Sequence, residues 1–438
     1  REAWRRVNRG RHTISPDDAP HSELTGSRRI LQTAPQDPQD DGANHRAPTE
    51  ENAMTFLKTT AAIAALFLAV PVAAAVTSAA DPQVVQTEAA AGDRPPGALQ
   101  GAPHQGGGAM SLYGLFKSKG PSGFGFNSTA EEVTEGRDLT GKTFLLTGCN
   151  SGLGQETMRV LALRGAKVIA VARTREKAAS AAAGIDGEIV PLACELSEPG
   201  SARAAAAEVV AAGYELDGII ANAGIMMLPK RTVQHGLELQ FLTNHIGHFL
   251  LVTGVLSRLT PNARVVMLSS AGHSATFPEG IRFDDLDAGK EYSALRNYGQ
   301  SKLANLLFAR ELSRRLPMGQ LAGSVHPGVL ATNLGRHLPS AIQMLFKSVG
   351  GAVALKTIPQ GAATQTYVAT HPDVTSTGAY WADCNVAKPS AHAQDEALAV
   401  ALWDKTEELA AALGAGSTTI SGGATGPSGR TYVIDITL

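Results

Sequence analysis

The fold is decided by the stretch Thr143-Phe-Leu-Leu-Thr-Gly-Cys-Asn-Ser-Gly-Leu-Gly154. Its first five residues form a short apolar run typical of a buried strand, and an amphipathic pattern over Leu153–Arg164 predicts that a helix follows. Glycines between a strand and a helix permit a tight turn and let the backbone approach a pyrophosphate. The N–H groups and positive dipole of the helix start favour the same anion. The stretch therefore predicts a dinucleotide-binding turn.

The same alternation of short apolar runs and longer helical patterns continues along the chain. The further expected strands are 167–172, 189–192, 217–221, 264–268 and 322–326, and the expected helices between them are 175–183, 198–212, 237–259 and 293–316. Repeated strand–helix units imply parallel strands joined by right-handed crossovers, because strands that are apolar throughout need helices on both faces. We therefore expect one α/β domain over residues 139–413, with a doubly wound (Rossmann-type) parallel sheet.

Composition and charge exclude several classes of protein. The 438 residues include 38 Lys and Arg against 40 Asp and Glu, so the formal net charge is -2. This balance, with no basic block, gives no electrostatic reason to expect nucleic-acid binding. The three cysteines, at positions 149, 194 and 384, are too few for a disulfide framework and too far apart in sequence for paired metal ligands.

The two ends of the chain differ in composition from its centre. Residues 1–109 lack a sustained amphipathic period and read as a disordered or non-native extension, 110–138 as a lead-in to the domain, and 414–438 as a disordered tail. Within the first segment, residues 54–80 have the layout of a secretory signal, with Lys58 before a short apolar run at 61–76 and an alanine-rich exit. An export signal, a membrane anchor and an over-extended reading frame remain open for this segment.

The end of the second predicted strand bears on the choice of cofactor. Val171-Ala172-Arg173 lies about twenty residues after the glycines, where a carboxylate would bind the 2′-hydroxyl of an adenosine ribose. Ala172 cannot do so, whereas the Arg173 guanidinium suits a 2′-phosphate. The pattern favours NADP(H) over NAD(H), although Arg173 could also be an ordinary solvated loop cation.

A second group of residues points to proton transfer. Tyr298 and Lys302 are four residues apart on a predicted helix and therefore share one face, where an ammonium would favour the phenolate. Ser270 follows the strand at 264–268, and Asn222 follows the strand at 217–221. In open parallel sheets ligands bind at these carboxyl ends. A Tyr and a Lys at this spacing are often coincidental, so the inference depends on the whole set.

Taken together, these motifs resemble the short-chain dehydrogenase/reductase family over residues 139–413. The ordered set comprises Thr-Gly-x-x-x-Gly-x-Gly from Thr147, Asn-Ala-Gly from Asn222, Asn244, Ser270 and Tyr-x-x-x-Lys from Tyr298. Four longer segments resemble the branch of retinol dehydrogenases and WW-domain oxidoreductases, although no WW domain is apparent. They are residues 244–250, 298–305, 326–332 and 380–384.

The resemblance implies a role for each matching residue. Tyr298 would be the acid or base at the substrate oxygen, Lys302 would lower its pKa and bind the nicotinamide ribose, Ser270 would polarise the carbonyl, and Asn244 would hold a water of a proton relay. The implied cofactor-binding residues are Gly148, Ser151, Gly152, Leu153 and Gly154 at the pyrophosphate, Glu195 and Leu196 at the adenine, Asn222, Ala223 and Gly224 at the adenosine ribose, and Pro327, Gly328, Val329 and Thr332 at the nicotinamide.

Two positions depart from the family pattern. Ala221 stands where a second Asn is usual, and Glu195 replaces the usual Asp, which puts the adenine contact of Glu195 in doubt.

Four histidines could be mistaken for metal ligands. They are His235, His245, His248 and His273. No acidic partner motif accompanies them, so we expect packing or local hydrogen bonding and no metal site.

The sequence thus predicts an NADP(H)-dependent oxidoreductase that interconverts an alcohol and a carbonyl on a hydrophobic small molecule. The alternatives are a catalytically silent NADP(H)-binding regulator and, among enzymes, a reductase of C=C bonds. We expect no nucleic-acid partner, membrane contact only through residues 61–76, and a cytoplasmic location because an exported enzyme would meet little NADP(H). The substrate and the oligomeric state, a homodimer included, stay open.

Overall fold

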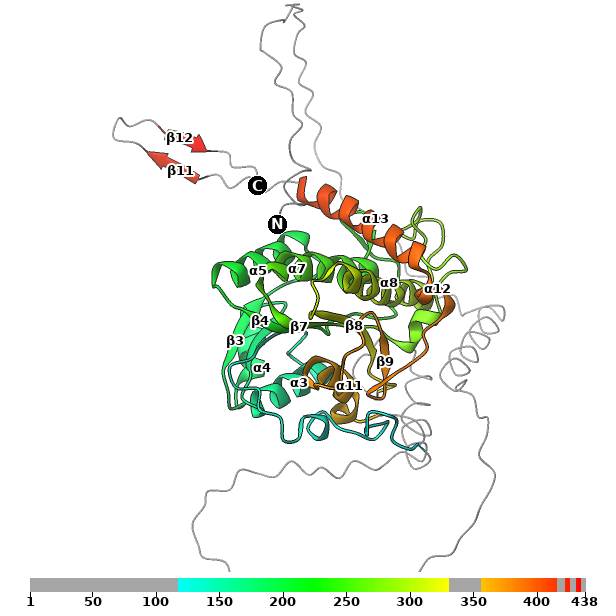
Figure 1. The fold of residues 1–438 in the computed structure, drawn as a ribbon. Coiled ribbons are helices and arrows are strands. Elements are labelled where there is room, and N and C mark those ends of the chain that lie inside the picture. The colour runs from blue at the N-terminus through cyan, green and yellow to red at the C-terminus, as the bar shows by residue number, and fades with distance from the viewer. Residues whose placement is uncertain (1–116, 331–355, 416–421, 426–430, 435–438) are drawn as a thin grey trace, which may run out of the picture. The chain divides into compact units, whose positions relative to one another are not determined.

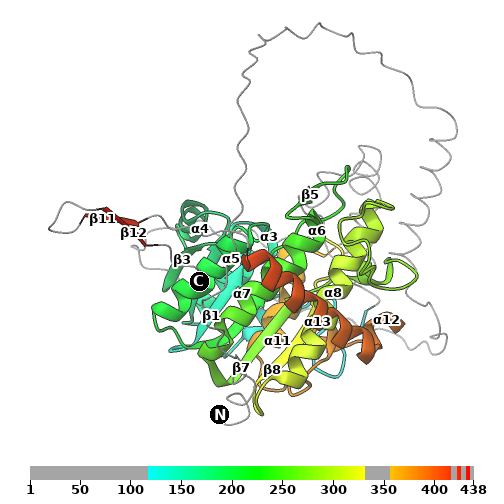
Figure 2. The same ribbon diagram turned by 90° about the horizontal axis from the view of Figure 1, so that it is seen from above.

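The computed structural model describes residues 117–330, 356–415, 422–425 and 431–434. Its centre is an eight-stranded sheet in the order β10-β9-β8-β7-β4-β1-β2-β3 (Figures 1 and 2). All neighbouring pairs are parallel except β9 and β10. The strands are β1 (Thr143–Thr147), β2 (Lys167–Ala172), β3 (Ile189–Ala193), β4 (Leu216–Ala221), β7 (Leu259–Leu268), β8 (Leu321–His326), β9 (Tyr380–Ala382) and β10 (Asn385–Val386).

Helices cover both faces of this sheet, as strands that are apolar on both sides require. The longer helices are α3 (Gly152–Leu163), α4 (Arg175–Ala182), α5 (Pro199–Ala211), α7 (Gly247–Val255), α8 (Ala294–Arg315), α11 (Ile358–Thr370) and α13 (Glu396–Ala415). The shorter ones are η1 (Glu132–Thr134), α6 (Leu239–Phe241), η2 (Leu242–Ile246), η3 (Leu256–Arg258), η4 (Ala271–Ser274) and α12 (Ala391–Gln394).

The core consists of two layers that meet opposite faces of the sheet. Successive strand residues alternate between them: Leu145 of β1 joins the layer of α5, α7, α8 and α13, whereas Phe144 and Leu146 join the layer of α3, α4 and α11. Figure 1 shows α5, α7 and α8 on one side of the strands and α3 and α11 on the other. The expected doubly wound α/β fold is therefore confirmed.

Most predicted strands and helices match the observed bounds within a few residues, but the helix expected at 237–259 is interrupted. Its first two residues form β6 (Leu237–Glu238), which pairs with β5 (Val233–Gln234), and η2 is a π-helix placed between α6 and α7. The prediction of one continuous helix was wrong because residues 240–252 are buried on all sides, and apolar residues around the whole helix hide a change of helical period.

The run Leu239–Arg258 is also long and apolar enough to span a membrane by length and composition alone. Of its most apolar window, 78% is buried inside the fold, as in the central helix of a globular core. Residues 61–76, where a membrane contact was expected, lie outside the described residues. So do the rest of the segment 54–80 and Thr332.

Residues before and after the predicted elements complete the domain. Phe124, in the lead-in, contacts Tyr367 of α11 edge to face at 5.6 Å between ring centroids, and the Ala130 amide donates to the Pro359 carbonyl. The helices α11 and α13 were not predicted from the sequence. Within the segment expected to be a tail, β11 (Gly422–Thr425) and β12 (Thr431–Ile434) pair with each other antiparallel.

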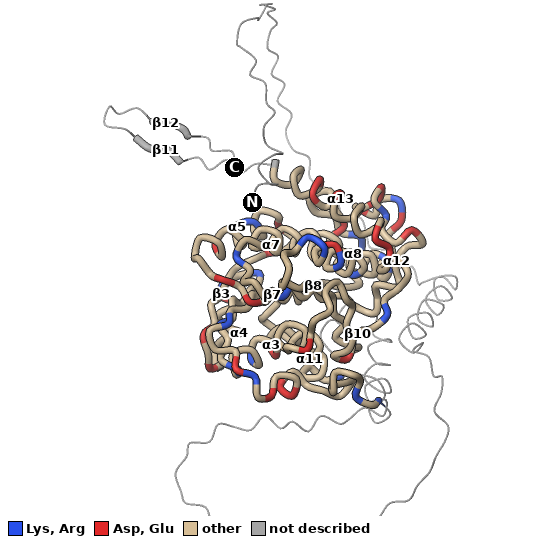
Figure 3. The backbone as a smooth tube through the Cα atoms, viewed as in Figure 1, with Lys and Arg blue, Asp and Glu red and all other residues tan. Residues whose placement is uncertain are grey.

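Charged side chains of both signs are interspersed over the outside of the domain. Figure 3 shows positions of Lys and Arg (blue) among those of Asp and Glu (red) around the outside of the domain, with uncharged residues (tan) elsewhere. Many of these charges are paired on the surface, as in Arg175 with Glu208 at 2.7 Å. Such exposed pairs contribute little to stability, so the two apolar layers hold the fold together.

Candidate active site

The turn after β1 has the geometry that its glycines predict. Gly148 adopts φ +70°, a left-handed conformation that favours glycine, and a Cβ there would lie 2.9 Å from the Ala223 Cα. A Cβ on Gly154 would overlap the Gly148 carbonyl oxygen. The turn leads into α3. The first turn of α3 contains no acidic residue, and the side chain of its N-cap residue Ser151 makes no capping hydrogen bond. These residues fit a dinucleotide pyrophosphate.

Asn222 holds this turn in place through its side chain. Its amide group donates to the Thr147 carbonyl at 2.8 Å, and its oxygen accepts from Gln365 of α11 at 3.2 Å. Asn222 is buried, so its side chain links the glycine turn, the end of β4 and α11. The Asn222 amide thus stabilises the backbone of the glycine turn. The implied contact of Asn222, Ala223 and Gly224 with the adenosine ribose stays a prediction.

The adenine end of the expected site is formed by the turns after β2 and β3. Ala172 is buried at the end of β2, and Arg173 is exposed at the start of the following turn. After β3, Glu195 accepts from the Ser197 hydroxyl at 3.0 Å. Leu196 is buried against α7, where a Cβ on Gly247 would overlap its carbonyl oxygen. Leu196 is thus also a core residue.

The structure brings Ser270 and Tyr298 together at the carboxyl end of β7. A Cβ on the intervening Gly272 would lie 3.0 Å from Cε1 of Tyr298 and 3.4 Å from Oγ of Ser270. The Ser270 hydroxyl accepts from the Gly272 N–H at 3.1 Å, which leaves its own proton available for an oxygen in front of it. Burial raises the pKa of Tyr298, and a hydrogen bond with Ser270 acts in the opposite direction.

Lys302 lies one helical turn beyond Tyr298, as its spacing predicts, but its ammonium is directed elsewhere. It donates to the Leu268 carbonyl at 3.0 Å and lies 5.9 Å from the centre of the Tyr298 ring. Burial lowers the pKa of Lys302 to about 8. Lys302 is not among the groups that shift the Tyr298 pKa in the structure, and the expected lowering of that pKa by Lys302 stays a prediction.

Asn244 occupies η2 and clamps the segment after β4. Its side-chain oxygen accepts from the Ile225 N–H and its amide donates to the Ile225 carbonyl, both at 2.8 Å. A second bond from the amide reaches Ser301 at 2.9 Å, next to Lys302. A Cβ on Gly224 would lie 3.2 Å from both the Asn244 Oδ1 and the Lys302 Nζ. The implied water of a proton relay at Asn244 stays a prediction.

The segment expected to meet the nicotinamide follows β8. Gly328 has φ +92°, and a Cβ there would meet the Lys356 side chain at 2.6 Å. The Val329 carbonyl accepts from the Lys356 N–H at 2.8 Å. The Lys356 side chain is fully buried and pairs with Asp383 at 2.6 Å, so an ion pair that sequence reasoning missed fixes Pro327 to Val329. No motif in the sequence points to this pair.

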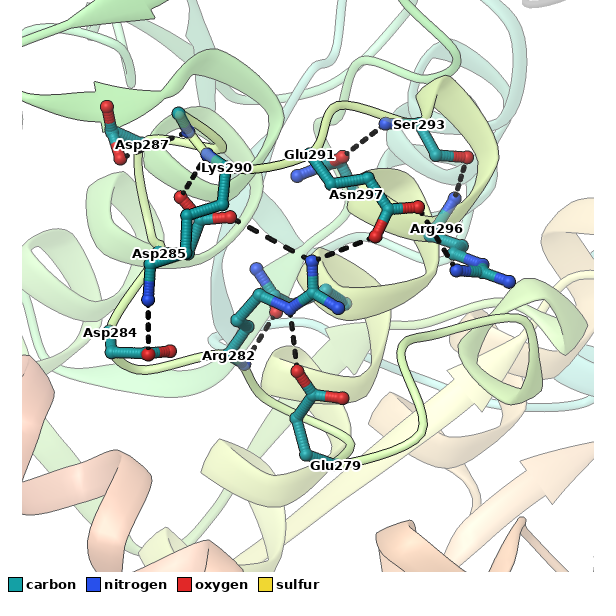
Figure 4. Close-up of polar contacts among 12 residues, drawn as sticks. Glu279, Arg282, Asp284, Asp285, Asp287, Lys290, Glu291, Ser293, Arg296 and Asn297 are labelled. Atoms are coloured by element: carbon teal, nitrogen blue, oxygen red, sulfur yellow. Dashed lines mark hydrogen bonds and ion pairs between the residues drawn. The ribbon is translucent and has the colours of Figure 1, made fainter.

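The loop between β7 and α8 contacts the N-terminal part of α8, the helix that contains Tyr298. Figure 4 shows Arg282 at its centre, within reach of Glu279, Asp285 and Glu291. The Arg282 guanidinium also lies 3.8 Å from the centre of the Phe277 ring, and its backbone N–H donates to Gln300 of α8 at 2.8 Å. This ionic cluster anchors the loop to α8 two residues beyond Tyr298.

Of the four histidines considered as metal ligands, His245, His248 and His273 are buried and hydrogen-bonded, and His235 pairs with Glu198 at the surface. His245 bonds to Thr406, and His248 bonds to Thr147 and to the Asn244 carbonyl. His273 accepts from the Ser390 N–H at 3.0 Å, so its other ring nitrogen donates to the Ser270 carbonyl. His273 thereby fixes the backbone of Ser270. Burial also raises the pKa of each cysteine thiol to about 12.

Comparison with known proteins agrees with this geometry. The family model for short chain dehydrogenases matches residues 142–283. Short-chain dehydrogenase TIC 32 A, chloroplastic, of Brassica napus is 42% identical over 322 residues, which cover 69% of this chain and 100% of that protein. Retinol dehydrogenase 14 of Mus musculus is 39% identical over 292 residues, or 62% of this chain and 86% of that protein.

Two further comparisons extend the match. The WW domain-containing oxidoreductase of Danio rerio is 36% identical over 66% of this chain and 73% of that protein. The crystal structure of an uncharacterized protein from Mycobacterium paratuberculosis superposes with a TM-score of 0.53 at 33% identity, covering 64% of this chain and 97% of that one. The chain belongs to the short-chain dehydrogenase/reductase family, in its retinol dehydrogenase-like branch.

Membership of this family defines the class of protein. It is an oxidoreductase that acts on small-molecule alcohols or carbonyls with a nicotinamide dinucleotide, NAD(H) or NADP(H). The glycine turn and the buried lysine described above fit such a cofactor, which supplies or accepts the hydride when bound.

Proposed function

We propose that this protein is an NADP(H)-dependent oxidoreductase that interconverts an alcohol and a carbonyl on a hydrophobic small molecule. The observation that carries the proposal is the convergence of Ser270, Tyr298 and Lys302 at the carboxyl end of β7, where the Lys302 ammonium and the Asn244 amide flank Gly224. A protein that only binds a nucleotide has no need for a hydroxyl pair of this kind. The cofactor-binding roles that the family resemblance implies for the other site residues are part of this proposal.

The roles of the two hydroxyl groups follow from their hydrogen bonds. In the reductive direction the Tyr298 hydroxyl gives its proton to the carbonyl oxygen as negative charge develops there, and in the oxidative direction it takes the proton back. Ser270 already accepts a bond from Gly272, so its O–H donates to the same substrate oxygen. Lys302 retains N–H groups beyond its bond to Leu268 and binds ribose hydroxyls with them.

Support for NADP(H) comes from the turn after β2. Arg175 is engaged by Glu208 and by the Pro191 carbonyl, and Thr174 caps α4 by accepting from Lys177. Arg173 is the exposed cation that directly follows the buried Ala172. Its guanidinium can form charge-assisted bonds to a 2′-phosphate, which are worth about 1.5–3 kcal/mol, or about ten- to a hundredfold in affinity.

The function is tested by turnover and binding together. The full chain is assayed with NADPH and NADH against hydrophobic aldehydes and ketones, and in reverse against alcohols, by nicotinamide absorbance. We expect turnover with a preference for NADP(H). Tight NADP(H) binding without turnover on a broad panel would instead identify the silent regulator, and reduction of the double bond of an enone would identify a C=C reductase.

The cofactor preference has its own variants. We expect Arg173→Ala to weaken NADP(H) binding about ten- to a hundredfold while changing NAD(H) binding little. The matched control is Lys177→Ala, which removes an exposed cation four residues later, in α4. Binding is measured by calorimetry. Equal affinity of the unmodified chain for both cofactors would reject the preference and leave the dehydrogenase assignment intact.

A further inference from the structure

His248 is a fully buried residue of α7 with both ring nitrogens engaged. Nδ1 lies 2.9 Å from the Asn244 carbonyl oxygen, which can only accept, so Nδ1 carries the ring proton. Nε2 lies 2.9 Å from the Thr147 hydroxyl. In a neutral ring Nε2 accepts, and the Thr147 hydroxyl therefore donates to it. Burial lowers the pKa of His248 to about 4, which agrees with a neutral ring.

The Thr147 hydroxyl continues this chain of hydrogen bonds. Its oxygen accepts from the Ala223 N–H at 3.0 Å. Three bonds therefore run from Ala223 through Thr147 and His248 to Asn244. They join the last residue of β1, the turn after β4 and the π-helix η2, three segments that are far apart in sequence. Each of these three hydrogen bonds can run in only one direction, so their donors and acceptors have a single possible arrangement.

Two members of this hydrogen-bond chain, Thr147 and Asn244, adjoin different parts of the proposed site. Gly148, which opens the expected pyrophosphate turn, follows Thr147 directly, and the Asn244 side chain clamps Ile225 and bonds to Ser301 beside Lys302. A π-helical turn is often retained where function requires a particular backbone arrangement. Here the carbonyl of its residue Asn244 accepts from the His248 ring, which ties the π-helix to β1.

We propose that His248 is a positioning residue, which holds the cofactor turn of β1 and the Asn244 clamp at the mutual placement that cofactor binding and hydride transfer need. The inference rests on the proposed function. His248 itself touches no reacting atom, and acts through Thr147 on one side and Asn244 on the other.

The chain supplies a matched control in His245, three residues earlier. His245 is equally buried, bonds to Thr406 at 2.9 Å and packs 5.2 Å from the Phe241 ring. Its hydrogen bond to Thr406 leads to α13, away from Thr147 and the glycine turn. Replacing either histidine by leucine removes a buried imidazole of the same size, so effects on folding are shared and effects on the site are not.

The experiment compares His248→Leu with His245→Leu in the full chain. We expect His248→Leu to weaken NADPH affinity in calorimetry, and to lower kcat, each about tenfold or more, because the Thr147 and Asn244 groups lose their buried partner. His245→Leu should lower the melting temperature but leave the affinity near that of the unmodified chain. Equal affinities and kcat values for the two variants would overturn the proposal.

A second pair of variants covers the case in which His248→Leu does not fold. Thr147→Val keeps the shape of the side chain but removes the hydroxyl, whereas Thr147→Ser keeps the hydroxyl. We expect Thr147→Val to bind NADPH about tenfold more weakly than Thr147→Ser, and indistinguishable affinities would overturn the proposal. Failure of the unmodified chain to bind NADPH would be a failure of the proposed function itself, so the two failures can be told apart. Nitrogen NMR of the His248 ring, expected to show a proton on Nδ1, tests the bond directions without any cofactor.

Discussion

The two halves of the sheet place different chemistry at their carboxyl ends. After β1 and β4 the site consists of backbone and neutral groups: Gly148, Gly154 and the Asn222 amide, which bonds to the Thr147 carbonyl. Around the carboxyl ends of β7 and β8 it holds titratable groups, two of them on α8. Burial raises the pKa of Tyr298, lowers that of Lys302 to about 8 and lowers that of His326 to about 4.

The difference separates binding from chemistry within one fold. A pyrophosphate needs N–H groups and close backbone approach, which glycine provides without any ionisable side chain. Proton transfer near neutral pH needs groups whose pKa values are matched to that range. Burial moves the pKa of Lys302 toward it but raises that of Tyr298, whose phenolate needs hydrogen bonds from Ser270 or a nearby positive charge. Substitutions in the first half should therefore change mainly cofactor affinity, whereas those in the second half should also change turnover and pH dependence.

The largest effect is expected at Tyr298. Tyr298→Phe removes only the hydroxyl, so kcat should fall about 10²–10⁴-fold, the typical contribution of a positioned acid or base, while cofactor affinity stays nearly unchanged. The matched control is Tyr292→Phe, which removes a hydroxyl bonded to the Leu228 carbonyl at 2.5 Å. Steady-state kinetics and calorimetry measure both quantities. A Tyr298→Phe variant with the unmodified rate would contradict the assignment of the acid.

The next effect is expected at Gly154, in the binding half. Gly154 lies within α3 without a left-handed φ, so only the lack of space opposes a side chain there. Gly154→Ala should force the turn apart, lower cofactor affinity at least tenfold and destabilise the fold by about 1–3 kcal/mol. kcat at saturating cofactor should change much less.

Gly200, in the first turn of α5, is the matched control for Gly154. A Cβ on Gly200 meets nothing within 4 Å. Gly200→Ala should therefore stabilise the fold by about 0.4–1 kcal/mol and leave cofactor affinity unchanged. Both are read by thermal unfolding and calorimetry. If the two alanine variants behave alike, the close approach of Gly154 to Gly148 does not shape the site.

The binding half was predictable from sequence because its signals are local. The strand Thr143–Thr147, the turn and the helix after it are adjacent along the chain, and the prediction matched the observed bounds of β1 and β2. Tyr298 and Lys302 were equally accessible, since helical spacing alone puts them on one face. The carboxyl-end rule for parallel sheets then added Ser270 and Asn222 to the same edge.

The contacts that complete the site could not be predicted because their partners are remote in sequence. Lys356 and Asp383 pair across a buried position, and each alone reads as an ordinary surface charge. His248 bonds to Thr147, 101 residues away, from an apolar run in which hydrophobic periodicity marks neither the π-helix nor the ring's partners. Long-range hydrogen bonds are set by tertiary packing, which a period of apolar residues does not encode.

The smallest expected effect concerns Lys302 in the cofactor-free protein and sharpens the contrast between the halves. The unfolded chain keeps the Lys302 proton up to the ordinary pKa of 10.5, whereas the folded chain releases it at about 8. Between these values the unfolded state binds more protons, so this group makes stability rise with pH, by about 1 kcal/mol per unit at most. The raised pKa of Tyr298 acts in the opposite direction only above its ordinary value of 10.0. The free energy of unfolding of the unmodified protein should therefore increase relative to that of Lys302→Met between about pH 8 and 10, as measured by urea unfolding. Parallel curves for the two proteins over that range would show that Lys302 is not held in a site that disfavours its charge. The same proton loss should weaken cofactor binding above about pH 8, because the charged ammonium is the form that donates most hydrogen bonds to the ribose.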